Sequence, residues 1–268
     1  MNLALTLRQM KAMISIYIQE GFAYRASGVI WILTDMGTAV TMPFLWIAAA
    51  GSGSIQGFTA ADFVAYYTVM LFVSSFVQSH FMWEIGYEVR EGIFSSQLIR
   101  PMNWYAFMLA RNIAWRVVRT FYFIPFAIAM CAMFWPWIST ANYYWGWEVW
   151  VLLILGHFTS VCFVMAMGLI ALFTQETDSI FGLYYFPMLF LSGRMFPVDV
   201  MPDWVKMLAV FSPFYYTTGA PTEAILGRAT APQMYAAMGW QALWIALCYV
   251  AYRVIWARGL RQYTGVGM

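Results

Sequence analysis

The chain has 268 residues, of which 63% are hydrophobic, 20% aromatic and only 10% charged, with a formal net charge of +2. Soluble domains carry about 25% charged residues, and so few charges could not cover the surface of a water-soluble fold of this size. The apolar residues form long blocks, each close to the ~20 residues that cross a hydrocarbon core of about 30 Å. The composition therefore predicts an all-α, polytopic membrane protein.

The same composition argues against several kinds of site. Lysine occurs only twice and there is no basic cluster, so we expect no nucleic-acid partner. The three cysteines all fall within apolar blocks, which is typical of small packing residues rather than of disulfides. His80 and Glu84 share one helix face, but two ligands do not make a metal site. We expect no bound metal.

Residues 1–24 have the pattern of an amphipathic helix, with apolar side chains such as Leu3, Leu7 and Ile14 at helical spacing and polar residues opposite. This pattern predicts a helix that lies in the membrane interface, the alternative being a soluble helix packed on a partner. No small-residue cleavage site follows a compact apolar run, so we do not expect a cleaved signal peptide.

Six membrane spans are expected after this helix. They are placed near residues 27–50, 60–83, 117–136, 148–173, 179–196 and 234–257. An aromatic-rich stretch at 137–147 is typical of a membrane–water boundary.

The distribution of Lys and Arg predicts the orientation. An even number of spans puts both termini on one side, and eleven of the 14 Lys and Arg residues fall on that side. The other side holds only Arg194, Lys206 and Arg228. We therefore expect both termini to be cytoplasmic.

Two connections are longer than turns, and we treat the whole chain, 1–268, as a single transmembrane domain that contains them. Residues 84–116 are expected to be cytoplasmic, amphipathic and rich in charge. Residues 194–233 are expected to be external and contain five prolines.

Sequence motifs in these two connections carry a family resemblance. Residues 88–101 read EVREGIFSSQLIRP, while the external segment reads SGRMFP at 192–197, MPDW at 201–204 and SPFY at 212–215. Together with the number and order of the spans and the N-terminal helix, these motifs resemble the type-2 ABC exporter permeases over nearly the whole chain.

The resemblance implies a cytoplasmic coupling helix that contacts a separate ATPase. The residues that it assigns to this role are Glu88, Glu91, Gly92, Ile93, Phe94, Leu98, Arg100 and Pro101. The residues themselves agree with such a contact, since Ile93, Phe94, Leu98 and Ile99 offer apolar anchors and acidic side chains offer a polar rim. The alternative is an interfacial helix that only connects two spans.

The resemblance further implies partners. Two copies of a nucleotide-binding ATPase subunit would bind ATP and Mg, and a second copy of this chain or a related six-span permease would complete the translocation path. The chain has no phosphate-binding loop of the form GxxxxGK[ST], so we expect no cofactor in this chain and no enzyme activity of its own. Membrane lipid is the remaining partner, and a bacterial inner membrane is the expected location.

The external segment would form short helices that re-enter the outer leaflet and gate the path. The residues assigned to this gate are Gly193, Phe196, Pro197, Pro202, Trp204, Pro213 and Phe214. An ordinary extracellular loop is the alternative.

Aromatic and ionisable residues within the spans are candidates for a substrate pathway. They are Asp35, Tyr66, Tyr67, Phe72, Phe76, Phe181, Tyr184 and Phe186. Each has a structural alternative: Asp35 could pair with an arginine, and the aromatic side chains could face lipid or pack between helices. His157, deep in the fourth span, is expected to be a neutral side chain hydrogen-bonded to a neighbouring helix.

The function that these patterns predict is export of a hydrophobic or amphipathic compound (a drug, natural product or lipid-like molecule), driven by a separate ATPase. An ion-coupled carrier is the alternative, resting on Asp35 and His157. An intramembrane enzyme is less favoured, because Ser192 and His157 lack a supporting carboxylate or oxyanion arrangement.

Overall fold

The computed structural model describes residues 3–174 and 177–264, apart from several side chains between residues 25 and 38 and those of residues 3 and 4. Helices carry nearly all of the described chain. In order they are α1 (Leu3–Ala23), α2 (Arg25–Ala50), α3 (Ala60–Val77), α4 (Met82–Arg90), α5 (Ile93–Leu98), α6 (Trp104–Ile138), α7 (Trp147–Gly168), α8 (Thr177–Leu191), α9 (Asp203–Phe211), α10 (Pro213–Ile225) and α11 (Ala231–Gln262).

Short elements complete the chain between these helices. A hairpin of β1 (Ser54–Ile55) and β2 (Phe58–Thr59) joins α2 to α3. Its two turn residues, Gln56 and Gly57, both have positive φ, as a tight two-residue hairpin requires. Two 3₁₀ turns follow, η1 (Leu169–Leu172) after α7 and η2 (Val198–Val200) before α9.

The helices confirm an all-α, polytopic membrane protein. Within the described residues, four helical segments are long and apolar enough to cross a membrane: Ala60–Arg90, Trp104–Ile138, Trp147–Leu172 and Ala231–Gln262. A shorter apolar segment, Ala39–Ala50, forms the second half of α2. The number of spans, six, stays a prediction.

The second expected span differs most from its sequence-based boundaries. Residues 60–83 were expected as one helix, but α3 ends at Val77 and α4 begins at Met82, so the backbone of Gln78–His80 is not helical. The third span also differs, because α6 begins at Trp104 and includes part of the connection expected at 84–116. Pro136, expected to close that span, lies inside α6, which continues to Ile138.

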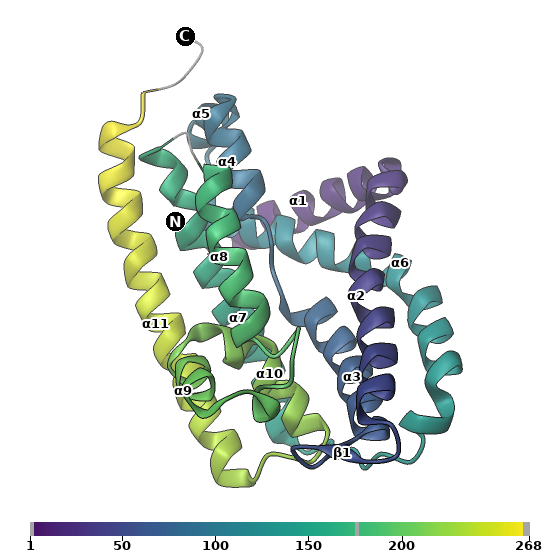
Figure 1. The fold of residues 1–268 in the computed structure, drawn as a ribbon. Coiled ribbons are helices and arrows are strands. Elements are labelled where there is room, and N and C mark those ends of the chain that lie inside the picture. Colours follow the sequence, from purple (N-terminus) through teal and green to yellow (C-terminus); the bar gives the residue numbers. More distant parts are fainter. Residues whose placement is uncertain (1–2, 175–176, 265–268) are drawn as a thin grey trace.

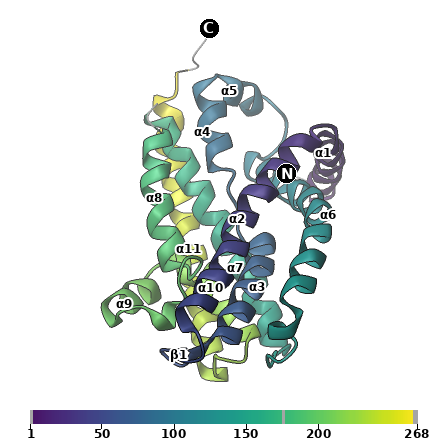
Figure 2. The same ribbon diagram turned by 45° about the vertical axis from the view of Figure 1, so that its right-hand side comes forward.

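Figures 1 and 2 show two distinct ends of the molecule. At one end, called here the α5 end, lie α4, α5 and the C-terminal end of α11. At the opposite end, called here the hairpin end, lie β1, α9 and α10. Helix α1 lies across the bundle beside the first part of α6, against which its Tyr17 and Phe22 rings pack.

Helix α7 joins the two ends by packing against α3, α4, α10 and α11. Gly156 lets it approach α10 closely, since a Cβ there would lie 3.1 Å from the carbonyl oxygen of Thr217. Gln241 of α11 donates hydrogen bonds to the carbonyls of Leu152 (2.9 Å) and Tyr216 (2.8 Å). A polar side chain shared between helices in this way fixes their register in an apolar environment.

Candidate functional site

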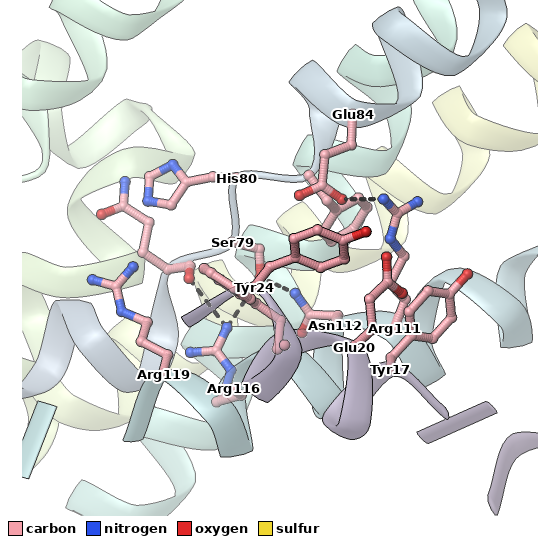
Figure 3. Close-up of a pocket in the computed structure, with 14 residues that line it drawn as sticks. Tyr17, Glu20, Tyr24, Ser79, His80, Glu84, Arg111, Asn112, Arg116 and Arg119 are labelled. Atoms are coloured by element: carbon pink, nitrogen blue, oxygen red, sulfur yellow. Dashed lines mark hydrogen bonds and ion pairs between the residues drawn. The ribbon is translucent and has the colours of Figure 1, made fainter. Parts of the chain in front are cut away.

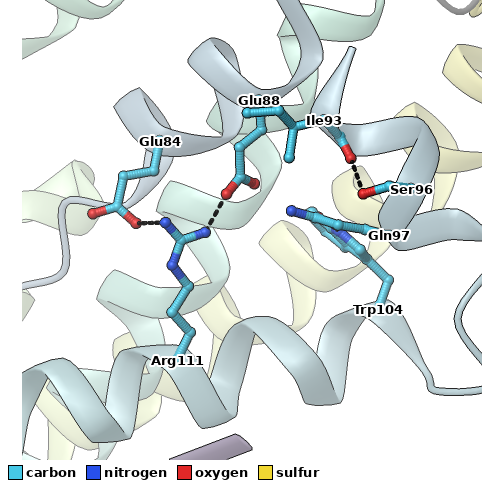
Figure 4. A network of polar contacts seen from close by, with 7 residues as sticks. All are labelled: Glu84, Glu88, Ile93, Ser96, Gln97, Trp104 and Arg111. Atoms are coloured by element: carbon cyan, nitrogen blue, oxygen red, sulfur yellow. Dashed lines mark hydrogen bonds and ion pairs between the residues drawn. The ribbon is translucent and has the colours of Figure 1, made fainter. Parts of the chain in front are cut away.

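The α5 end is built from a helical pair that turns at one glycine. Gly92 connects α4 to α5 with a φ of +74°, a left-handed conformation that glycine adopts without steric cost. The turn lets the short helix α5 fold back over α4 and the start of α6, as Figure 4 shows. The Gly92 position was part of the predicted coupling motif, and its conformation explains why a glycine stands there.

Phe94 holds α5 to the rest of the chain. Its ring is fully buried and makes edge contacts with Trp104 and Tyr263, at centroid distances of 5.6 and 5.3 Å. Trp104 Nε1 also donates a hydrogen bond of 2.9 Å to the buried Gln97 side chain. The sequence predicted Phe94 as an apolar anchor for a partner, but the structure places its side chain inside this chain, where it packs α5 against α6 and the residues after α11.

Arg111 of α6 connects three helices through one guanidinium group (Figure 4). Its Nη2 lies 2.9 Å from Oε2 of Glu84, and its Nη1 donates to Oε1 of Glu88. The guanidinium carbon also lies 5.5 Å from the centre of the Tyr17 ring of α1. Burial raises the pKa of the Tyr17 phenol, so this contact is made by the neutral ring.

Glu88 is therefore an internal residue. It was expected in a polar rim around the coupling helix, but its side chain is buried against Arg111, and Glu88 Oε2 has no hydrogen-bond partner among the described residues. Glu88 lies on α4, a helix of nine residues, which is too short for its periodicity to predict which side chains face inward.

Several predicted coupling residues do lie on the surface. Ile93 and Leu98 are exposed, and Ile99 is 85% exposed. Glu91 and Arg100 are also exposed, and the carbonyl of Pro101 accepts a hydrogen bond of 2.9 Å from Gln9 of α1. Ile93, Leu98 and Ile99, called here the α5 apolar patch, thus lie on a helix fixed on its other side by buried contacts.

The interruption between α3 and α4 brings charged groups into the bundle (Figure 3). Arg116 of α6 donates hydrogen bonds to the carbonyls of Ser75 (3.1 Å), Phe76 and Gln78 (3.1 Å), which lie at the end of α3. On the far side, Nδ1 of His157 lies 3.0 Å from the Val77 carbonyl. Because a carbonyl only accepts, this nitrogen donates. Irregular backbone at membrane depth requires such protein partners.

Two predicted pathway residues hold the predicted external motif in place. The hydroxyl of Tyr66 donates to the Gly193 carbonyl at 3.0 Å, and that of Tyr67 donates to the Met195 carbonyl at 2.7 Å. Trp46 Nε1 in turn donates to the Tyr67 hydroxyl at 2.8 Å. Both tyrosines are buried, so they position the segment after α8.

The other predicted pathway residues fall into separate groups. Phe72 and Phe76 pack on Phe123 of α6, whereas Tyr184 stacks on Phe163 and contacts Phe214. These remaining positions differ in exposure, since Phe181 is buried and Phe76 and Phe186 are exposed. The side chain of Asp35 lies outside the described residues.

The predicted gate residues gather at the hairpin end. Phe196, Pro202 and Trp204 line an apolar cavity of about 540 Å³ between α8 and α9. Pro213 begins α10, and Gly193 turns the chain after α8 with a φ of +80°. Pro197 precedes η2, and Phe214 contacts Tyr184 of α8. Helices α9 and α10 thus fill the segment expected to be re-entrant.

Sequence reasoning missed Glu223 in this region. Its side chain is 7% exposed on α10, and its Oε2 accepts a hydrogen bond from the Tyr215 hydroxyl. Burial, followed by the nearby charge of Asp199, raises the pKa of Glu223 to about 8, although Tyr215 and Arg228 act in the opposite direction. The available signal was a single acidic residue within the otherwise uncharged run 213–227.

Comparison with known protein families decides what kind of molecule this is. The family model described as "ABC-2 family transporter protein" matches residues 36–267, which is most of the chain. The chain belongs to the ABC-2 transporter family. A comparison with curated proteins finds no match.

Membership gives the ABC-2 protein a general role. It is the multi-pass membrane component of an ABC transporter, and it works with an ATPase subunit. The match begins within α2, so it includes the hairpin end, the interruption after α3 and the α5 end.

Proposed function

We propose that this ABC-2 protein is the permease subunit of an exporter that moves a hydrophobic or amphipathic compound out of the cytoplasm or the inner leaflet. Two copies of a separate ATPase would bind ATP and Mg, and a second permease, identical or related, would complete the path. The termini and the α5 end would face the cytoplasm, in a bacterial inner membrane.

The observation that carries the proposal is the α5 apolar patch. Exposed apolar side chains at a helix end are typical of a docking surface, and such anchors dominate the energy of an interface. Buried contacts of Phe94 fix the inner side of α5. A push on the patch would therefore move α5 together with α6, which carries Trp104 and Arg111.

The transport path would form between two permeases. Phe76 is exposed, and Phe186 is 67% exposed, so both are available to line a shared surface. The cavity beneath Trp204 and the buried positions of Tyr66 and Tyr67 support a role for the external segment as a gate. The resemblance of the two motifs to exporter permeases supports the proposed direction of transport and class of cargo.

The test is affinity purification of the tagged chain after mild solubilisation, followed by identification of copurifying proteins and ATP hydrolysis. A stoichiometric ATPase is expected with the wild-type chain, and Ile99→Glu should reduce its recovery at least about tenfold, the effect of a central apolar anchor. The control is Arg258→Glu, a change to the same residue type at an exposed position of α11. Copurification unaffected by Ile99→Glu would reject the patch as the docking surface.

A chain that remains alone after crosslinking in cells would instead favour the ion-coupled carrier. Transport that follows an imposed ion gradient, without an ATPase, would then establish that alternative.

A further inference from the structure

The interruption between α3 and α4 opens into a cavity of about 210 Å³. Helix α1 closes one side of it and α6 the other, and Figure 3 shows their polar side chains pointing into the space between them. The cavity is separate from the α5 apolar patch and from the apolar cavity at the hairpin end.

The two ends of the cavity differ in charge. Arg116, Arg119 and His80 gather at one end in Figure 3, and Glu20 lies at the other beside Arg111. Arg111 is already engaged by Glu84 and Glu88. The polar lining therefore offers positive charge on one side and a carboxylate on the other.

Arg116 makes its hydrogen bonds only to neutral oxygens. Its partners are three backbone carbonyls and the Ser79 hydroxyl, the last at 3.3 Å, and no ion pair to a carboxylate is present among the described residues. A charge within a membrane span is costly unless it is compensated. Carbonyls at the end of α3 compensate part of this charge, and a bound anion would compensate the rest.

Asn112 supplies a second, independent observation. The side chain is 5% exposed and lines the cavity, and its Nδ2 donates to the Ser79 hydroxyl at 3.1 Å. Its Oδ1 has no hydrogen-bond partner among the described residues. A buried acceptor left without a donor costs stability, so a ligand that enters here should bring an N–H or O–H group.

Helix α6, which lines one side of the cavity, also carries an exposed apolar face. Ile113, Val117 and Phe121 recur every four residues and are exposed. Asn112 and Arg116 each precede one of them by a single residue, so this apolar face lies about 100° around α6 from the polar one. A ligand held by the polar face would have its remaining part against an apolar, lipid-accessible one.

We propose that this cavity binds the headgroup of phosphatidylethanolamine. The phosphodiester lies at the end formed by Arg116 and Arg119, the ammonium group points toward Asn112 Oδ1 and Glu20, and the acyl chains follow Ile113, Val117 and Phe121. This lipid combines the three groups for which the site has partners. Its phosphate is an anion for the arginines, its ammonium group is a cationic hydrogen-bond donor for the two oxygens, and its acyl chains are apolar. The bound lipid is distinct from the transported compound, and the proposal does not depend on the direction of transport.

The test compares lipids that differ in one group. The full-length chain is purified in mild detergent, supplied with equal amounts of phosphatidylethanolamine and phosphatidylcholine, and examined by native mass spectrometry for retained lipid. The three methyl groups of phosphatidylcholine remove the N–H donors and leave the charge. We expect about a tenfold preference for phosphatidylethanolamine, the ratio that one charge-assisted hydrogen bond supports. Equal retention of the two lipids would overturn the proposal.

Substitutions locate the site. Arg116→Gln should abolish retention of both lipids, and Arg258→Gln, an exposed arginine of α11, is its control. Because Arg116 also supports the end of α3, Arg116→Gln could lose lipid through misfolding alone. Glu20→Gln, a change at an exposed position of α1, tests the site without disturbing that support. Glu20→Gln should lower the preference for phosphatidylethanolamine, because it removes the charge-assisted hydrogen bond, and should weaken phosphatidylcholine less, because that lipid loses only the attraction between charges. Asp203→Asn is its control. Retention by both variants at the wild-type ratio would also overturn the proposal.

A last arm distinguishes a lipid from a soluble ligand. Phosphoethanolamine carries the same charges without acyl chains, and we expect it not to displace the bound lipid at equal concentration. Displacement at equal concentration would assign the cavity to a soluble phosphate compound and refute the lipid assignment.

Discussion

Arg194, the residue after the turn at Gly193, donates a hydrogen bond of 2.7 Å to Oε1 of Gln78, the residue that follows the last turn of α3. Two arginines therefore contact the interruption of the second span. Arg194 of the predicted external motif bonds the Gln78 side chain, and Arg116 of α6 bonds the Gln78 carbonyl. This arginine, counted from the sequence as an external charge, is partly buried and bonded to the residue that follows α3. This contact links the predicted gate to the middle of the protein.

We expect Arg194→Gln to lower the free energy of unfolding by about 1.5–3 kcal/mol, the range for hydrogen bonds to a charged group. The measurement is thermal or denaturant unfolding of the purified protein in one detergent, with Lys206→Gln of α9 as control. A double-mutant cycle with Gln78→Leu should give a coupling free energy of at least about 0.5 kcal/mol. Additive effects would mean that the contact contributes nothing to stability.

The Arg111 network predicts an asymmetric response to substitution. Arg111→Leu leaves the buried Glu88 without its partner and should cost about 3 kcal/mol, whereas Glu84→Gln, at a half-exposed position, should cost less than about 1 kcal/mol. Arg111→Lys should fall between them, because one ammonium group cannot hold two carboxylates in a forked geometry. Unfolding measurements check the order, and equal costs for Arg111→Leu and Glu84→Gln would contradict it.

Much of this architecture could be predicted from the sequence. Long apolar blocks give the helices, and the EGIF and SGRMFP motifs lie in two separate parts of the fold, the first at the α5 end and the second after α8. The interruption at Gln78–His80 could not be predicted, because it contains neither Pro nor Gly and depends on distant partners. Arg116 binds its carbonyls and the Ser160 hydroxyl accepts from the Ser79 amide at 2.9 Å.

The burial of Glu88 and Phe94 has the same origin in tertiary contacts. Both depend on residues far along the chain, Arg111 for the first and Tyr263 for the second. Local periodicity gives no information about such contacts over short helices. The position of Arg194 was missed because α8 ends at Leu191, earlier than the expected limit of the span at 196.

Glu223 predicts a pH dependence with a definite sign. Its pKa is raised from 4.5 to about 8 in the folded protein, so the folded state holds this proton when the unfolded state has released it. The free energy of unfolding should therefore fall as pH rises from about 4.5 to about 8 and become flat above that. Glu223→Gln should remove this slope, as measured by unfolding temperature across the range, with Asp199→Asn as a milder change. An unchanged slope in Glu223→Gln would assign the pH dependence to other groups.

The backbone conformation of Gly92 should affect binding of the ATPase, because it sets the position of α5. At a φ of +74°, Gly92→Ala should cost about 1–2 kcal/mol and displace α5, whereas Gly92→Asn should cost less because asparagine tolerates the left-handed region. Since α5 carries the exposed Ile99, displacement should also weaken recovery of the ATPase. We expect the order wild type, Gly92→Asn, Gly92→Ala, Gly92→Val in both ATPase copurification and stimulated ATP hydrolysis, with the amount of folded permease measured in parallel. If Gly92→Val retained full coupling while folding normally, the turn at Gly92 would not set the position of the docking surface.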